Sequence, residues 1–185
     1  YLSGHSDVMM GTVATTQEIW APLAERCDAF GMTVSPDDAW LVLRGLRTLS
    51  ARLKMHEQHA LQVAHWLTTQ PAVKTVFCPA LPTDPGHALW KRDCDGTNGL
   101  ISFELPVGTS GDTVDRLIDG MKLFGLGASS GGYESLVTPA AMTQARTVTD
   151  WSARGPIIRL HIGLEDPADL IADLAQAFSG AQLAS

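Results

Sequence analysis

A single arginine interrupts the apolar run Ile157–Ile162, which alternates in the manner of a β-strand. Arg159 and His161 would share one side of that strand, with the residues at 158, 160 and 162 on the other. A charge in so apolar a strand needs an anionic partner, because burying an unpaired charge is costly. An internal acid or an exposed strand side is the interpretation that the residues alone favour. The alternative is a ligand carboxylate, which a planar guanidinium can bind through two hydrogen bonds.

A second stretch that could do chemistry is Gly127–Leu136, which combines serines with paired glycines. Small residues let main-chain N–H groups approach a phosphate, a carboxylate or another part of the chain. A glycine-rich stretch is weak evidence for a ligand site by itself. The residues alone therefore favour a tight turn here.

Two further groups of polar residues have the right composition for a site but the wrong pattern. His56, His59 and His65 could bind a metal by spacing, but no acid or thiol accompanies them, so we predict a solvated helix face and no metal. The run Gly4–Asp7 holds His, Ser and Asp side by side. Hydrolase triads are assembled from distant segments, so this run does not indicate one.

The elements expected to position these residues follow from hydrophobic periodicity and capping residues. We predict a helix over 17–30, with Ile19, Trp20, Leu23 and Cys27 on one side, after an opening stretch, 1–14, of loop and short strand. Ser35 is a good N-cap, and apolar residues recur from Ala39 to Leu67, which predicts one continuous helix of about thirty residues that joins two domains. Strands are expected at 73–78, 99–105, 123–127 and 157–162, and helices at 112–121 and 166–180. This order predicts a small antiparallel or mixed sheet covered by helices.

Composition excludes several functional classes. The chain has 185 residues, a net charge of −7 and no basic patch, which argues against nucleic-acid binding. No apolar run approaches the roughly 20 residues needed to cross a membrane. Cys27, Cys78 and Cys94 show no paired spacing and predict free thiols, as in the cytoplasm. The first residues lack an initiator Met and do not resemble a natural start.

Taken together, the motifs resemble the pyridoxal-phosphate (PLP) dependent enzymes of cysteine and methionine metabolism. The resemblance extends from Tyr1 to about Phe178, with the motifs in the family's order. The matching blocks are Tyr1–Asp7, Gly31, Ser35–Leu49, Pro85–Asp93, Gly99–Phe103, Ser129–Leu136 and Ile158–Glu165.

This resemblance implies roles for individual residues. The cofactor lysine would immediately precede Tyr1, so we expect residues 1–185 alone to show no PLP absorbance and no lyase activity. Arg159 would bind the α-carboxylate of the substrate, and Ser129 would help to position that carboxylate and the lysine. Ala128 and Ser130 would line the distal pocket, where large aromatic residues are expected in the β-eliminating branch, so the pocket would be roomier here.

The resemblance also implies a fold, an activity and an assembly. The fold would be the α/β fold of aspartate-aminotransferase-like (fold type I) PLP enzymes, with residues 1–46 ending the large cofactor domain and 47–185 forming the small C-terminal domain. The activity would be β-elimination of cystathionine to homocysteine, pyruvate and ammonia. Alternatives are the γ-reactions of sister enzymes or, in another class, a non-catalytic regulator on the same fold. An N-terminal remainder of the same polypeptide and a homotetramer would complete the molecule.

Overall fold

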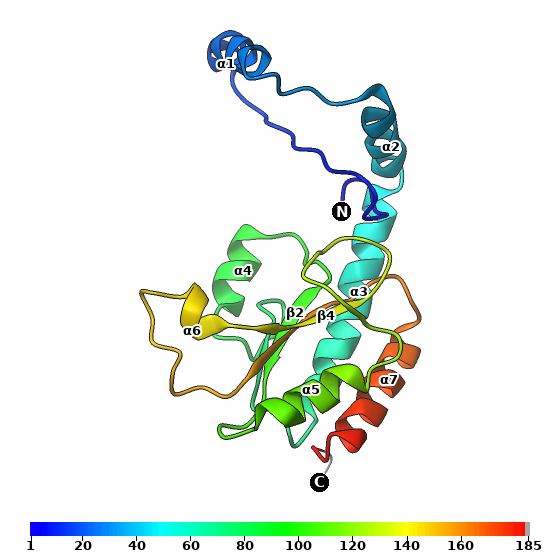
Figure 1. The fold of residues 1–185 in the computed structure, drawn as a ribbon, viewed down its shortest axis with the longest axis vertical. Helices are drawn as coiled ribbons and strands as arrows, with labels where there is room; N and C mark the ends of the chain where they lie inside the picture. Colours follow the sequence, from blue (N-terminus) through cyan, green and yellow to red (C-terminus); the bar gives the residue numbers. More distant parts are fainter. Residues whose placement is uncertain (184–185) are drawn as a thin grey trace.

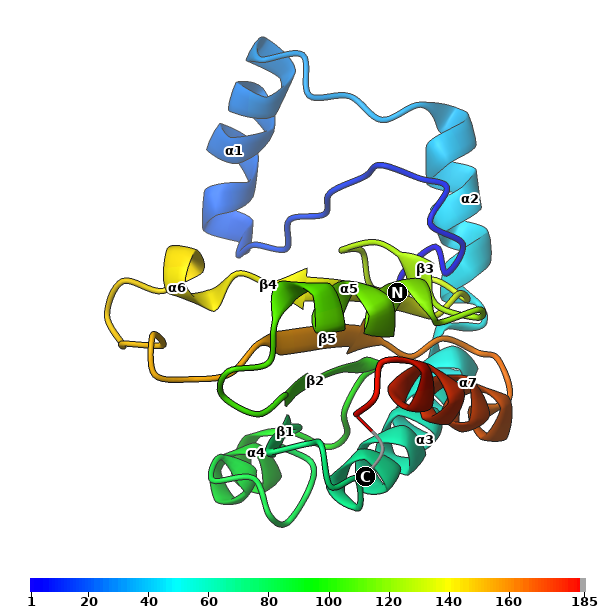
Figure 2. The same ribbon diagram turned by 60° about the horizontal axis from the view of Figure 1, so that its bottom comes forward.

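The computed structural model describes residues 1–183 and consists of a compact body from which an N-terminal arm projects (Figure 1). The last two residues of the predicted small domain, 184–185, lie outside this range. The arm, residues 8–46, contains α1 (Gln17–Ala29) and α2 (Pro36–Leu46). The body is a sheet with helices packed against it (Figure 2). Within the described range, no helix combines the length and apolar character that a membrane crossing requires.

The helix predicted to continue from α2 is broken, so that prediction is wrong. α2 ends at Leu46, and α3 (Leu49–Thr68) begins after two non-helical residues. Thr48 donates its main-chain N–H and its hydroxyl to the Gly45 carbonyl, which closes the last turn tightly. Gly45 also lies against the main chain of Leu2 and Ser3, where a side chain would clash. The break thus coincides with a contact to the start of the chain, which hydrophobic periodicity does not register.

The sheet has five strands in the order β1-β2-β5-β4-β3. Its pairs are antiparallel except β3 with β4, which confirms the predicted mixed sheet. The strands are β1 (Thr75–Phe77), β2 (Leu100–Glu104), β3 (Gly125–Leu126), β4 (Leu136–Ala140) and β5 (Ile157–His161). β4 was not predicted, because it contains Pro139 and follows directly on the glycine-rich stretch. No strand forms within residues 1–14, contrary to the prediction.

The remaining helices of the described chain are α4 (His87–Asp93), α5 (Gly111–Asp119), α6 (Met142–Ala145) and α7 (Pro167–Gly180). α5 and α7 occur where predicted. The side chains of Ser110 and Asp166 accept main-chain N–H groups at their N-termini. α4 and α6 were missed because they are short and lack side-chain caps.

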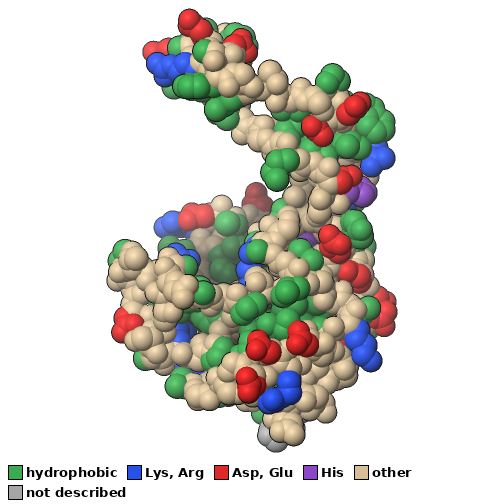
Figure 3. Space-filling model, viewed as in Figure 1, with side chains coloured by type: hydrophobic (Ala, Val, Ile, Leu, Met, Phe, Trp, Pro, Cys, Tyr) green, Lys and Arg blue, Asp and Glu red, His purple; other side chains and the backbone are tan. Residues whose placement is uncertain are grey.

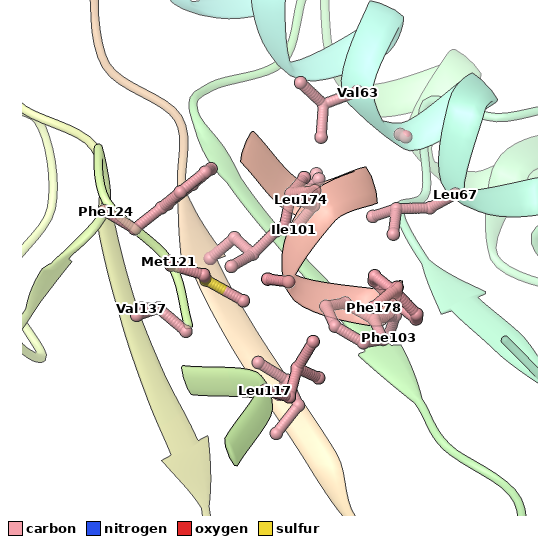
Figure 4. Close-up of a cluster of buried hydrophobic side chains, with 14 of the residues drawn as sticks. Val63, Leu67, Ile101, Phe103, Leu117, Met121, Phe124, Val137, Leu174 and Phe178 are labelled. Carbon is pink, nitrogen blue, oxygen red and sulfur yellow. The ribbon is translucent and has the colours of Figure 1, made fainter. Parts of the chain in front are cut away.

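The hydrophobic core lies between the sheet and helices α3, α5 and α7 (Figure 4). Alternate residues of the central strands point into it, among them Ile101, Phe103 and Leu160. The opposite side of β5 carries Arg159, which is therefore left outside this core. The core fixes the strand on which the arginine stands.

Replacing Leu174 with alanine is expected to lower the free energy of unfolding by about 2–5 kcal/mol, because it leaves a cavity in this core. Leu174 is fully buried on α7 (0 % exposed). The midpoint of urea unfolding measures the change. Leu126→Ala is the matched control, because Leu126 is 76 % exposed, and it should cost less than about 0.5 kcal/mol. Equal effects of the two changes would contradict this account of the core.

The arm exposes many large apolar side chains (Figure 3). The helix predicted at 17–30 is confirmed as α1, and Gly31 follows it with a positive φ of 65°. None of its residues is buried against the rest of the described chain. Among its predicted apolar side, Ile19 and Trp20 are more than half exposed.

Candidate functional site

Arg159 stands in the middle of β5, on the side of the sheet that faces away from the core. Its neighbours across the sheet are Ser102 on β2 and Thr138 on β4. No acidic side chain of residues 1–183 forms an ion pair with it, so an internal salt bridge is excluded. Its Nη1 donates to the Ala128 carbonyl at 2.8 Å. The rest of the guanidinium makes no hydrogen bond within the described chain, and it offers donors suited to a carboxylate.

The segment Ala128–Gly132 lies beside Arg159, between β3 and β4. Ala128 and Ser129 are exposed, Ser130 is half-buried, and the two glycines are buried. Neither serine hydroxyl has a hydrogen-bond partner among the described residues. Gly131 has a φ of 89°, which favours glycine, and the chain bends here without a hydrogen-bonded turn. The structure therefore bonds Arg159 to the first of the three predicted pocket residues, and the other two follow it directly in the chain.

Tyr1 packs against Gly131, near the end of this segment. Its hydroxyl accepts the Gly99 N–H at 2.9 Å, and its main-chain nitrogen lies against Gly131, which has no room for a side chain there. Burial raises the pKa of the Tyr1 phenol, and the Gly99 hydrogen bond opposes this. Any atom bonded to the Tyr1 nitrogen would start next to the Ala128–Gly132 segment.

A buried arginine that the sequence analysis did not single out holds Tyr1 in place. Arg52 on α3 is 7 % exposed, and its Nη1 donates to the Tyr1 carbonyl at 2.6 Å. Its Nη2 donates to the carbonyls of Leu2 and Gly45 at 3.2 and 2.8 Å, and its Nε donates to the Thr48 hydroxyl at 3.1 Å. Burial lowers the pKa of the guanidinium, which remains a cation at neutral pH. Arg52 thereby ties the first residues of the chain to the α2–α3 break.

Two histidines lie behind Tyr1, and one of them corrects a prediction. His56 was expected on a solvated helix face but is fully buried, because α3 packs against the end of β5, where its Nδ1 donates to the Ile162 carbonyl at 2.8 Å. His161 is also buried, and the two ring centroids are 5.3 Å apart. Burial lowers the pKa of both rings, so both are neutral at pH 7. Of the other two predicted surface histidines, His59 is partly buried and His65 is exposed.

Glu165 binds Ser135, which lies between the Ala128–Gly132 segment and β4. Its carboxylate accepts the Ser135 N–H at 2.7 Å and the Ser135 hydroxyl at 2.8 Å. The Ser135 hydroxyl oxygen in turn accepts the Gly163 N–H at 2.8 Å. The segment before β4 is thus bonded to the segment after β5, and these hydrogen bonds hold the two segments together.

The run Gly4–Asp7 forms no triad. His5 contacts the Ser3 carbonyl, and neither Ser6 nor Asp7 is hydrogen-bonded to it in the structure. Across residues 1–183, no group of three or more His, Cys, Asp or Glu side chains is arranged to hold a metal ion.

A family model described as Cys/Met metabolism PLP-dependent enzyme matches residues 1–179. The chain belongs to this family. Relatives include cystathionine beta-lyase of Bordetella avium, 46 % identical over 98 % of this chain and 46 % of the relative. Cystathionine gamma-lyase of Dictyostelium discoideum is 38 % identical over 96 % of this chain and 47 % of the relative. The chain thus spans about half the length of these curated relatives.

A solved structure of cystathionine gamma synthase from Xanthomonas oryzae pv. oryzae, in complex with aminoacrylate and cysteine, has a similar fold. It superposes with a TM-score of 0.86 and is 40 % identical, over 98 % of this chain and 48 % of the other. The expected PLP-enzyme α/β fold is confirmed by this likeness together with the family match. This chain has four lysines, Lys54, Lys74, Lys91 and Lys122. Within the described residues, none of their side chains is hydrogen-bonded to the Ala128–Gly132 segment.

Proposed function

We propose that this chain supplies the substrate-carboxylate side of the active site of a PLP-dependent cystathionine β-lyase. The observation that carries the proposal is Arg159, a strand arginine without an acidic partner in the described chain, directed at a segment with two unbonded serine hydroxyls. A guanidinium in this setting suits the carboxylate of an amino acid, which it can bind through two parallel hydrogen bonds.

Under this proposal, each residue at the site has a defined task. Arg159 binds the α-carboxylate, and Ser129 donates a further hydrogen bond to it or to the cofactor lysine. Ala128 and Ser130 line the pocket around the distal part of the substrate. Because both side chains are small, this part of the pocket is wide.

The residues at the site fit the reacting side of a PLP enzyme. The lysine that carries the cofactor would be bonded to the Tyr1 nitrogen, which lies against Gly131 and beside the carboxylate site. When bound, PLP withdraws electrons from the α-carbon of the amino acid, so that its proton can leave. The residues of this chain would hold the substrate carboxylate, and Arg52 fixes the main chain of Tyr1, which would follow the lysine.

We further infer that these residues belong to a longer polypeptide, in which 1–46 end the cofactor domain and 47–185 form the small domain. Two observations support this: the chain spans 46 % of its β-lyase relative, and the arm exposes Trp20, Phe30, Met32 and other large apolar side chains. An exposed apolar surface of this kind indicates a protein interface. The preceding part of the polypeptide, and neighbouring subunits of a homotetramer, would cover it and complete the cofactor site.

β-Elimination is favoured over γ-elimination by the higher identity to the β-lyase relative, 46 % against 38 % and 41 % for two γ-lyases. γ-Chemistry is the second candidate, since the γ-synthase structure shares the fold and 40 % of its residues.

The products formed from L-cystathionine distinguish the two reactions. The full polypeptide loaded with PLP is expected to release pyruvate, ammonia and homocysteine, because the bond from Cβ to sulfur breaks. Breakage of the bond from Cγ to sulfur would yield 2-oxobutyrate, ammonia and cysteine. Mass spectrometry of the keto acids decides between them. Predominant 2-oxobutyrate would refute the β-lyase assignment. If neither pyruvate nor 2-oxobutyrate formed, the result would favour a non-catalytic regulator.

A further inference from the structure

Two residues on the same side of β5 hold the two ends of the Ala128–Gly132 segment. Arg159 Nη1 donates to the Ala128 carbonyl at 2.8 Å. His161, two residues further along the strand, has its Nε2 at 3.1 Å from the Gly131 nitrogen. One strand therefore sets the position of the segment that carries Ser129 and Ser130.

The contacts of His161 Nε2 depend on the tautomer of its ring. The Gly131 N–H can donate to this nitrogen only if it bears a lone pair, whereas the Gly132 carbonyl, also at 3.1 Å, can accept only if it bears a proton. One nitrogen of a neutral ring cannot do both. The tautomer therefore decides which of the two peptide groups is fixed.

His56 lies beside His161, but no hydrogen bond joins the two rings. Its Nδ1 donates to the Ile162 carbonyl, so its Nε2 bears a lone pair, and this buried atom has no partner among the described residues. The Nδ1 of His161 is likewise buried without a partner there. Within the described residues, the Gly131 N–H has no acceptor other than His161 Nε2. The other tautomer would leave this buried N–H without a partner, and an orphaned buried N–H is rarer in proteins than an unpaired carbonyl.

We propose that His161 is a positioning residue of the carboxylate site, with its Nε2 lone pair fixing the Gly131 N–H. The proposal rests on the proposed function, because it assumes that Arg159 and Ser129 bind the substrate carboxylate. His161 itself does not touch the substrate. It acts by keeping the Ser129 hydroxyl in register with the guanidinium of Arg159.

The test compares two variants of the full-length, PLP-loaded enzyme. His161→Leu removes the acceptor at similar size, whereas the side-chain oxygen of His161→Gln can take the place of Nε2. His161→Leu should raise KM for L-cystathionine and the Kd of propionate about tenfold, as the loss of one hydrogen bond implies, with a much smaller change in kcat. His161→Gln should restore both constants to within about threefold of the unmodified enzyme. Propionate binding, measured by calorimetry, reports on the carboxylate site without turnover.

Unchanged propionate binding in His161→Leu would overturn the proposal, as would equal weakening in both variants. Arg159→Ala separates this failure from failure of the proposed function. If Arg159→Ala does not weaken propionate binding, the carboxylate site itself is wrongly assigned. If it does, and His161→Leu binds normally, only the positioning role is lost.

The tautomer can be tested directly by spectroscopy. In ¹⁵N-histidine-labelled holoenzyme, NMR should show a protonated Nδ1 and an unprotonated Nε2 for His161, identified by the signal that disappears in His161→Gln. His56 should show the same pattern, from its bond to the Ile162 carbonyl. A protonated His161 Nε2 would contradict the proposal even if the kinetic result agreed.

Discussion

Replacing Arg159 with alanine in the full-length, PLP-loaded enzyme is expected to reduce kcat/KM for L-cystathionine about a thousandfold. Two charge-assisted hydrogen bonds to the substrate carboxylate are lost, each contributing about 1.5–3 kcal/mol, and each 1.4 kcal/mol corresponds to a factor of ten. The hydrogen bond from Nη1 to the Ala128 carbonyl is lost as well, so the Ala128–Gly132 segment loses a contact that holds it to β5. Steady-state kinetics with L-cystathionine measures the change.

Two controls define what this result would mean. Arg159→Lys keeps the positive charge but lacks the planar pair of donors, and it should recover only a small part of the loss. Arg146→Ala removes an exposed arginine of the same chain and should leave kcat/KM within about twofold, as surface changes usually do. Comparable losses for Arg146→Ala and Arg159→Ala would mean that general charge, not a clamp, supports activity.

Replacing Arg52 with methionine is expected to lower the free energy of unfolding by about 3 kcal/mol, because the carbonyls of Tyr1 and Leu2 lose their buried donor. Gly45 suffers less, since Thr48 still donates to its carbonyl. Methionine fills a similar volume, so the loss reflects the hydrogen bonds more than the packing. Urea unfolding measures the stability of the variant.

Arg44→Met provides the matched control for this second prediction. Arg44 lies on α2, close to Arg52 in sequence, but its side chain is exposed and stacks over Trp40 at 5.4 Å. Its loss should cost less than about 1 kcal/mol. If Arg52→Met were no more destabilising than Arg44→Met, the start of the chain would not depend on the buried guanidinium.

Local patterns in the sequence were sufficient to predict β5 and the position of Arg159 within it. Alternation located the strand, and the capping residues located α5 and α7, because these signals act over a few residues. The same reasoning put Arg159 on the other side of the strand from residues 158, 160 and 162, as the structure has it, but left open whether an internal acid would pair with it. The pocket roles of Ala128, Ser129 and Ser130 came from family resemblance and stay predictions, although the structure brings these residues beside Arg159.

What the sequence could not predict depends on contacts between distant residues. His56 is buried against Ile162, which lies 106 residues away in the sequence. The pattern of its own helix therefore gives no sign of this burial. The same holds for Arg52, whose contacts to Tyr1 and Leu2 span about fifty residues and also accompany the break before α3. Spacing alone indicated a solvated helix face and a continuous helix, and tertiary contacts changed both.

The most direct test of the carboxylate site is a crystal structure of the full-length enzyme with PLP and a bound amino acid. The proposed function predicts that the α-carboxylate lies about 2.7–3.0 Å from the nitrogens of Arg159, with the Ser129 hydroxyl on the same group. The lysine before Tyr1 should face the α-carbon from beside Gly131. A carboxylate bound elsewhere, with Arg159 turned to solvent or paired with an acid of another segment, would contradict the central claim.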